Sequence, residues 1–155
     1  LFPVQLVLCA SPDYLRRHGV PDQMAALAAH RCSVYRNPGT GRVVPWRFRV
    51  GGEEVEQPVV PALSTNDEIV ELHAVLAGRV IAQLAGVTAA PYLRAGQLVP
   101  LLVDHMPDRY SYFVYYGNRQ AQPARVRAFV DLAVERLVDN ADYVLSASEL
   151  AAAGR

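Results

Sequence analysis

The chain of 155 residues contains no lysine: all fifteen of its basic side chains are arginines, and they balance fifteen acidic ones. With no net charge, the chain shows no preference for a non-specific nucleic-acid or membrane-surface partner. Charged residues make up only 19% and hydrophobic residues 52%, which excludes a disordered, collagen-like or coiled-coil chain. This length and composition are typical of one globular domain and too small for two.

Cysteines and long apolar runs are also scarce. The two cysteines, Cys9 and Cys32, lie far apart, and a chain of this size needs no disulfide, so we expect free thiols and a reducing, cytoplasmic compartment. No apolar run reaches the roughly 18 residues of a membrane-spanning helix, and no export signal is visible. Because Leu1 already lies in an apolar segment of strand character, we expect the natural product to start further upstream.

Motifs for catalysis and metal binding are missing as well. The sequence has no glycine-rich phosphate loop, no His-Glu-x-x-His, no Cys-x-x-Cys and no Gly-x-Ser-x-Gly. The histidines are scattered, at His18, His30, His73 and His105. One enzymatic alternative uses Cys32 with a histidine, but the neighbouring Val34 and Tyr35 predict a buried strand, where a thiol is unreactive. We therefore expect no enzyme, no metal and no cofactor.

The sequence does contain alternating strand and helix patterns, which predict an α/β fold. Residues 4–10 form an apolar run of strand length, and Ser11-Pro12-Asp13 begins a helix that ends at Gly19. We expect the alanine-rich tail, residues 139–155, to be frayed. The other expected strands cover 32–35, 43–50, 55–60, 80–84, 98–103 and 110–116, and the other expected helices 22–30, 65–78, 88–95 and 123–138.

Polar side chains at two helix starts carry a binding hypothesis. Ser11 follows one strand, and Ser64, Thr65 and Asn66 open another helix, with Thr65 and Glu68 in the spacing of a capping box. The free N–H groups of both helices should then point into one crevice at the carboxyl edge of a sheet. Helix N-termini bind carboxylate or phosphate, which favours a small anion. Taken alone, both clusters are explained more simply by ordinary capping, because most helices need such caps.

Short segments along the chain resemble the LysR-type transcriptional regulators, in the family's own order. Residues 10–15 followed by 18–21 are similar to the family pattern ASPxYLxxHGxP, and Trp46-Arg47-Phe48 to its WxF. Arg79 and Ala85 depart from the small residue and the proline that the family usually has there. The remaining matches are residues 27–32, 66–67, 74–84, 90–93, 96–102, Tyr115 and Tyr116 with Arg119, and residues 125–131.

The resemblance implies the periplasmic-binding-protein-like (type II) effector-binding fold, in which two α/β subdomains joined by crossing strands enclose a small molecule. Residues 1–29 would end the first subdomain and form a hinge, and residues 30–101 would be a complete second subdomain. Residues 102–138 would be the return hinge and the C-terminal part of a partial first subdomain, and residues 139–155 a tail. The family's winged helix-turn-helix would precede Leu1.

The function implied is that of an effector-binding domain in a cytoplasmic bacterial transcription regulator. Its partners would be a small, anionic effector, a second copy in a homodimer or homotetramer, and DNA only through the absent N-terminal domain, with no membrane. The matched positions suggest Ser11, Ser64, Thr65 and Asn66 as effector contacts. Two alternatives remain: a solute-binding protein of similar fold that works in transport, and the Cys/His enzyme.

Replacing Thr65 by Ala tests the expected contact. We expect a weaker effector response and, through the lost helix cap, a free energy of unfolding lower by about 1 kcal/mol. Titration of effector into the folded Thr65→Ala variant of the intact protein checks this prediction, and an unchanged affinity would contradict it.

Overall fold

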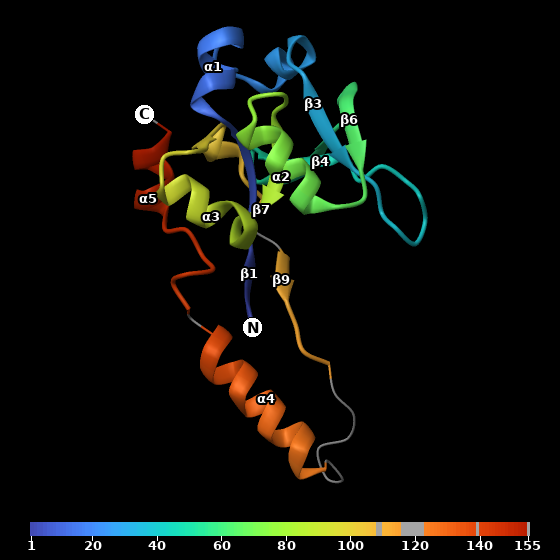
Figure 1. The fold of residues 1–155 in the computed structure, drawn as a ribbon, viewed down its shortest axis with the longest axis vertical. Helices are drawn as coiled ribbons and strands as arrows, with labels where there is room; N and C mark the ends of the chain where they lie inside the picture. The colour runs from blue at the N-terminus through green and yellow to red at the C-terminus, as the bar shows by residue number, and fades with distance from the viewer. Residues whose placement is uncertain (108–109, 116–122, 139, 155) are drawn as a thin grey trace.

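A computed structural model describes residues 1–107, 110–115, 123–138 and 140–154 (Figure 1). The matched residues Tyr116 and Arg119 lie outside these ranges. Within them, none of the helices has the length and apolar character needed to cross a bilayer. The elements are β1 (Phe2–Val4), β2 (Leu6–Ala10), α1 (Pro12–His18), the 3₁₀ helix η1 (Met24–Ala29), β3 (Cys32–Tyr35), β4 (Trp46–Val50), β5 (Glu53–Gln57), β6 (Pro61–Thr65), α2 (Glu68–Leu76), β7 (Ala82–Ala85), α3 (Gly86–Arg94), β8 (Val99–Pro100), the 3₁₀ turn η2 (Val103–His105), β9 (Tyr110–Tyr112), α4 (Ala124–Leu137) and α5 (Ala147–Ala153).

Two small sheets meet in the centre of the molecule. β2 pairs antiparallel with β7 on one side and with β8 on the other, while β3 and β6 are parallel. A parallel bridge between Cys32 and Ile81 connects the two sheets, giving the lateral order β6-β3-β7-β2-β8. β1 leaves this arrangement and, within the described part of the chain, pairs only with β9.

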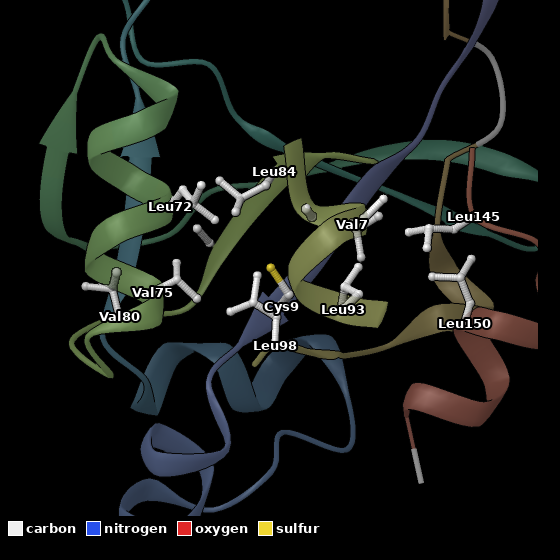
Figure 2. Close-up of a cluster of buried hydrophobic side chains, with 13 residues drawn as sticks. Val7, Cys9, Leu72, Val75, Val80, Leu84, Leu93, Leu98, Leu145 and Leu150 are labelled. Atoms are coloured by element: carbon white, nitrogen blue, oxygen red, sulfur yellow. The ribbon is translucent and has the colours of Figure 1, made fainter. Parts of the chain in front are cut away.

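The two faces of β2 support two hydrophobic clusters. Val7 and Cys9 face one cluster, and Leu8 and Ala10 face the other, as the alternation of side chains along a strand requires. On the first face, α2, α3 and the C-terminal segment pack against the sheet, as Figure 2 shows. The second face is covered by Tyr14 of α1, Leu27 of η1, and Trp46 and Phe48 of the β4–β5 hairpin.

The outline predicted from the sequence is largely confirmed, with local differences. Residues 4–10 are two strands, because the pairing partner changes at Gln5, from β9 before it to β7 and β8 after it. The helix expected at 22–30 is a short 3₁₀ helix, η1. β6 was not predicted, since its sequence Pro-Ala-Leu-Ser-Thr has little strand character and owes its form to pairing with β3.

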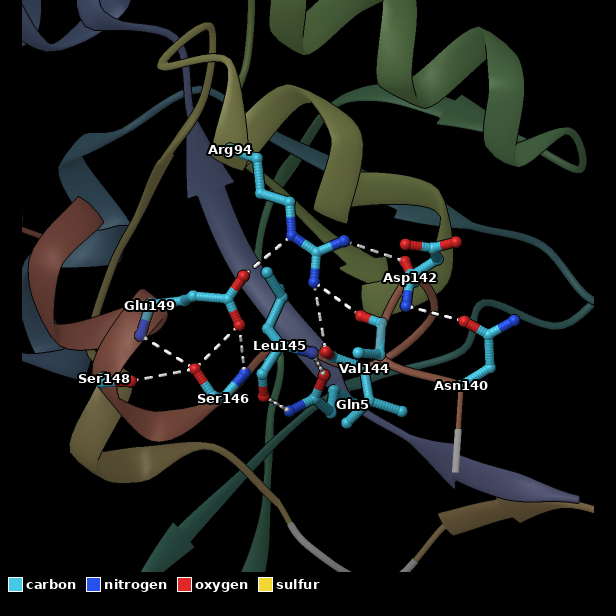
Figure 3. Close-up of polar contacts among 10 residues, drawn as sticks. Gln5, Arg94, Asn140, Asp142, Val144, Leu145, Ser146, Ser148 and Glu149 are labelled. Carbon is cyan, nitrogen blue, oxygen red and sulfur yellow. Dashed lines mark hydrogen bonds and ion pairs between the residues drawn. The ribbon is translucent and has the colours of Figure 1, made fainter. Parts of the chain in front are cut away.

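The expectation of a frayed C-terminal tail is wrong. Residues 147–153 form α5, whose capping box joins Ser146 and Glu149, and Leu145 and Leu150 are buried in the first cluster. Arg94 of α3 holds this segment through bonds of 2.7 to 3.3 Å to Glu149 Oε1 and to the carbonyl oxygens of residues 141, 142 and 144 (Figure 3). The amide of Gln5 also pairs with both backbone groups of Leu145.

α4 is different from the other helices. It is amphipathic and spans nearly the residues predicted, yet none of its side chains is buried, and Phe129 is 65% exposed. Figure 1 shows it set apart from the body of the molecule, at the end where β1 and β9 lie.

Replacing Arg94 by Ala should release the C-terminal segment. We expect a free energy of unfolding lower by about 1–2 kcal/mol, because several hydrogen bonds to backbone carbonyls are lost at a partly exposed site. Hydrogen exchange of residues 140–154 should become faster than in the wild type. The control is Arg136→Ala, because Arg136 is exposed and pairs only weakly with Glu135 at 3.8 Å. Equal exchange in the Arg94 variant and the wild type would show that Gln5 and the apolar contacts hold the segment without Arg94.

Candidate functional site

A cleft of about 520 Å³ opens at the sheet edge where β3 and β7 end and where α2 and α3 begin. One wall comes from these elements, and the other from β1 and β9 with the start of β4. Such a volume fits a small organic molecule. The lining residues are Val4, Leu6, Tyr35, Val44, Pro45, Arg47, Glu68, Glu71, Gln83, Ala85, Tyr110, Ser111 and Tyr112.

The strand geometry places these side chains. Tyr35 and Ala85 are the last residues of β3 and β7, whose carboxyl ends point the same way. Gln83 and Ala85 share one face of β7, whereas Ala82 and Leu84 face the core on the other. Because β2 runs antiparallel to β7, its first residue, Leu6, pairs with Ala85 and lies at this edge too.

Two carboxylates of α2 face the cleft. Glu68 accepts a hydrogen bond from Ala85 N at 2.6 Å and so joins the start of α2 to the end of β7. Glu71 is only 2% exposed and accepts a hydrogen bond from the buried Ser33 hydroxyl. Burial raises the pKa of Glu71 to about 7; the Ser33 bond opposes this shift and the negative charge of Glu68 adds to it.

The one cationic side chain of the lining, Arg47, is already engaged. Its terminal nitrogens contact Glu54 at 3.2 Å, Glu56 at 3.4 Å and the Tyr110 hydroxyl. Its Nε is buried with no hydrogen-bond partner among the described residues. The Gln83 side-chain amide donates a hydrogen bond to the backbone carbonyl of Arg47 at 2.7 Å and accepts one from its backbone N–H at 2.9 Å. Arg47 therefore fixes the hairpin against the sheet and has little capacity left for an anionic ligand.

The predicted contacts Ser64, Thr65 and Asn66 lie beside this cleft but outside its lining. Thr65 ends β6 and is in register with Tyr35 of β3. Its Oγ1 accepts a hydrogen bond from Asp67 N at 3.1 Å, while Ser64 Oγ accepts one from Arg36 Nε at 2.7 Å. Asn66 is exposed in the turn that follows.

The capping box expected from Thr65 and Glu68 is wrong, and so is the loss of stability expected for Thr65→Ala through a lost helix cap. The N-cap of α2 is Asp67, whose carboxylate accepts a hydrogen bond from Ile69 N at 2.8 Å. Thr65 remains extended because it pairs with β3, so the helix starts later than the sequence pattern predicts. The helix expected at 88–95, by contrast, starts earlier than predicted, at Gly86.

Ser11 lies elsewhere. It caps α1 as predicted, with its hydroxyl accepting from Tyr14 N at 3.3 Å, and it is 3% exposed. Because β2 is antiparallel to β7, however, the carboxyl end of β2 lies at the opposite sheet edge, close to Gly78 after α2. The expectation that both helix starts share one crevice is therefore wrong, and the structure does not bring Ser11 together with Ser64, Thr65 and Asn66.

Glu71 was missed in the sequence, although a signal was present. Glu68, Glu71, Leu72 and Val75 follow the i, i+3, i+4, i+7 spacing of a single helix face. Two carboxylates on the same stripe as buried apolar residues indicate a helix whose first turn meets a polar site.

The cysteines are free and buried, which confirms the expectation for Cys32. Burial raises the pKa of Cys9 to about 12 and that of Cys32 to about 11, so neither forms a thiolate near neutral pH. Cys32 Sγ lies 3.6 Å from the carbonyl oxygens of Leu27 and His30. Over the part of the chain that the structure describes, no three potential metal ligands come together.

Comparison with known proteins agrees with this architecture. Residues 1–138 match the family described as the LysR substrate binding domain. The chain belongs to this family. Its relatives include the regulator YcaN of Escherichia coli, described as an uncharacterized HTH-type transcriptional regulator, which is 36% identical over 83% of the chain.

Solved structures of LysR-type regulators share the fold. The regulatory domain of CrgA from Neisseria meningitidis superposes with a TM-score of 0.74, at 29% identity, over 88% of this chain and 67% of that one. Full-length AphB, a virulence activator of Vibrio cholerae, superposes with a TM-score of 0.72, at 27% identity, over 86% of this chain and 45% of that one. The predicted periplasmic-binding-protein-like type II fold is thus confirmed. This LysR-type domain spans 41% of the length of YcaN.

The free energy of unfolding should depend on the ionisation of Glu71. Its pKa in the folded protein, about 7, lies above its ordinary value of 4.5, so stability is greatest below pH 4.5 and falls as the pH rises through 7. The loss should approach about 3 kcal/mol. The variant Glu71→Gln should lack this component, and the difference between its urea unfolding and that of the wild type, from pH 4 to pH 8, isolates it from other titrating groups. A difference that does not change with pH would contradict the shifted pKa.

Proposed function

We propose that this LysR-type domain is the effector-sensing part of a bacterial transcription regulator, and that its effector binds in the cleft at the ends of β3 and β7. The observation that carries the proposal is the position of the cleft. It lies at the carboxyl edge of parallel strands, where open α/β sheets bind ligands, and against the β1–β9 pair that leads out of the sheet.

Three of the four predicted effector contacts lie near the cleft, and the fourth does not. Thr65 and Asn66 lie at the rim of the cleft, within one helical turn of Glu68, and Ser64 is beside them, so we keep these three as proposed contacts from this side. Ser11, at the opposite edge, is too far away to share a small ligand with them, and we propose a capping role for it.

The division into subdomains at residues 30 and 101 stays a prediction. The contacts favour a second subdomain that is larger than residues 30–101. β2 shares a sheet with β7 and β8, and residues 140–154 pack against α3 and bond Gln5, just before β2. α4 would then belong to the first subdomain. Its exposed apolar side chains, such as Phe129 and Leu132, would then pack against other parts of that subdomain.

We further propose that effector binding changes the relative placement of the two subdomains and so the geometry of a homo-oligomer on DNA, in the cytoplasm. Such a shift requires that the effector bind two arrangements with different affinity, since equal affinity would shift nothing. A cleft whose walls come from the sheet on one side and from β1 and β9 on the other provides this difference, because moving the walls changes the contacts.

Replacing Ala85 by Phe should block the cleft. The side chain of Ala85 lines it, whereas its backbone N–H, which donates to Glu68, is unaffected by the change. The intact protein is screened by thermal unfolding against a library of metabolites, and each compound that stabilises the wild type is tested on the variant. We expect the Ala85→Phe variant to lose the stabilisation and the associated change in transcription from the target promoter.

The matched control is Val60→Phe, which adds a phenyl ring at a position that is 86% exposed and outside the lining. This control should respond as the wild type does. Stabilising metabolites that act equally on Ala85→Phe and wild-type protein would place the effector elsewhere and overturn the proposal.

A further inference from the structure

We infer that the cleft selects an organic cation: a small molecule with a protonated amine attached to an apolar or aromatic body. This inference rests on the proposed function, because it takes the cleft at the ends of β3 and β7 to be the effector site. It departs from the small anion that the helix starts suggest, and it names the chemical class from the side chains that line the cleft.

The first argument is a buried carboxylate with an open acceptor. Glu71 lines the cleft with only 2% of its surface exposed, and its Oε1 accepts the Ser33 hydroxyl. No other donor among the described residues bonds Glu71, and Arg47 Nε is the one buried side-chain nitrogen or oxygen there that lacks a partner, so Oε2 keeps access to the cleft. A buried carboxylate without a full set of partners is costly. An ammonium group in the cleft supplies both the missing hydrogen bond and the missing charge.

The second argument is the balance of charge. Glu68, one turn earlier on α2, adds a second carboxylate to the lining, and its negative charge contributes to the raised pKa of Glu71. The N-terminus of α2 offsets only part of this charge. Arg47, the one cation of the lining, is shared between Glu54 and Glu56. The cleft therefore has a surplus of negative charge, which repels carboxylates and attracts amines.

The third argument is the remaining lining. Tyr35 and Tyr112 face the same cleft as the two carboxylates, and aromatic rings attract cations through their electron-rich faces. Tyr112 lies near Glu68, whose charge adds to the burial that raises the pKa of this tyrosine. Val4, Leu6, Val44 and Pro45 supply an apolar surface for the body of the ligand.

The test uses three probes that share a phenyl ring and differ in charge: 2-phenylethylamine, 3-phenylpropionate and 2-phenylethanol. Each is titrated into the intact protein at pH 7.5 by calorimetry. We expect the amine to bind about tenfold more tightly than the carboxylate, with the neutral alcohol between them.

Three variants assign the preference to its cause. Glu71→Gln keeps an amide oxygen that accepts from Ser33, so the fold is retained, and it should weaken amine binding about fivefold while leaving the alcohol unchanged. Ala85→Phe should abolish binding of all three probes. The control, Glu135→Gln, removes an exposed carboxylate of α4 and should bind as the wild type does.

Acidification gives an independent readout. Between pH 7.5 and pH 5.5 the amine stays protonated while Glu71 becomes neutral. The affinity of the wild type for the amine should therefore fall several-fold over this range, and that of Glu71→Gln much less. The other titratable or charged groups that line the cleft with Glu71 are Glu68 on α2, Tyr35 on β3, Arg47 on β4, and Tyr110 and Tyr112 on β9, and the charge of Glu71 also raises the pKa of the buried Cys9 on β2.

The outcomes separate this inference from the proposed function. If 3-phenylpropionate binds at least as tightly as the amine and loses binding in Ala85→Phe, the cleft is a ligand site and the charge preference is wrong. Amine binding that is absent, or that is unchanged in Glu71→Gln, also overturns the inference. The proposed function is judged separately, by the metabolite screen with Ala85→Phe and Val60→Phe.

Discussion

The structure depends on the burial of β2 beyond its first residue, Leu6. Val7, Leu8, Cys9 and Ala10 are each at most 1% exposed, because β7 and β8 pair with both edges of the strand and hydrophobic clusters cover both faces. A strand in this position determines where the neighbouring strands and both hydrophobic clusters lie. Its antiparallel direction brings Leu6 and Ala85 together at the cleft and carries Ser11 to the far edge, so one choice of strand direction decides which helix starts can share a ligand.

The cleft combines groups that are individually ordinary into a site with a defined charge. Glu68 connects α2 to the end of β7, Glu71 is held by Ser33, and Gln83 fixes the backbone of Arg47. Each of these polar side chains joins two elements of the fold and also lines or supports the cleft. In the proposed site, packing and recognition therefore use the same residues.

The sequence predicted the fold class and most elements, because apolar periodicity and helix stop signals such as Gly19 act over a few residues. It failed where pairing partners distant in the chain decide the local structure. β6 and the extended form of Thr65 depend on β3, and α5 depends on Arg94 and Gln5. The cleft could not be found from helix starts alone, since strand direction is a property of the whole sheet; the carboxylates on the apolar stripe of α2 were the more informative signal.

The docking of residues 140–154 has a mechanical consequence for α4. β9, which precedes α4, pairs with β1, and the segment that follows α4 is fastened by Arg94 and Gln5, so the helix is connected to the sheet on both sides. Because both of its flanks are tethered to the same sheet, α4 can be displaced from the body of the molecule only as far as the two tethers reach.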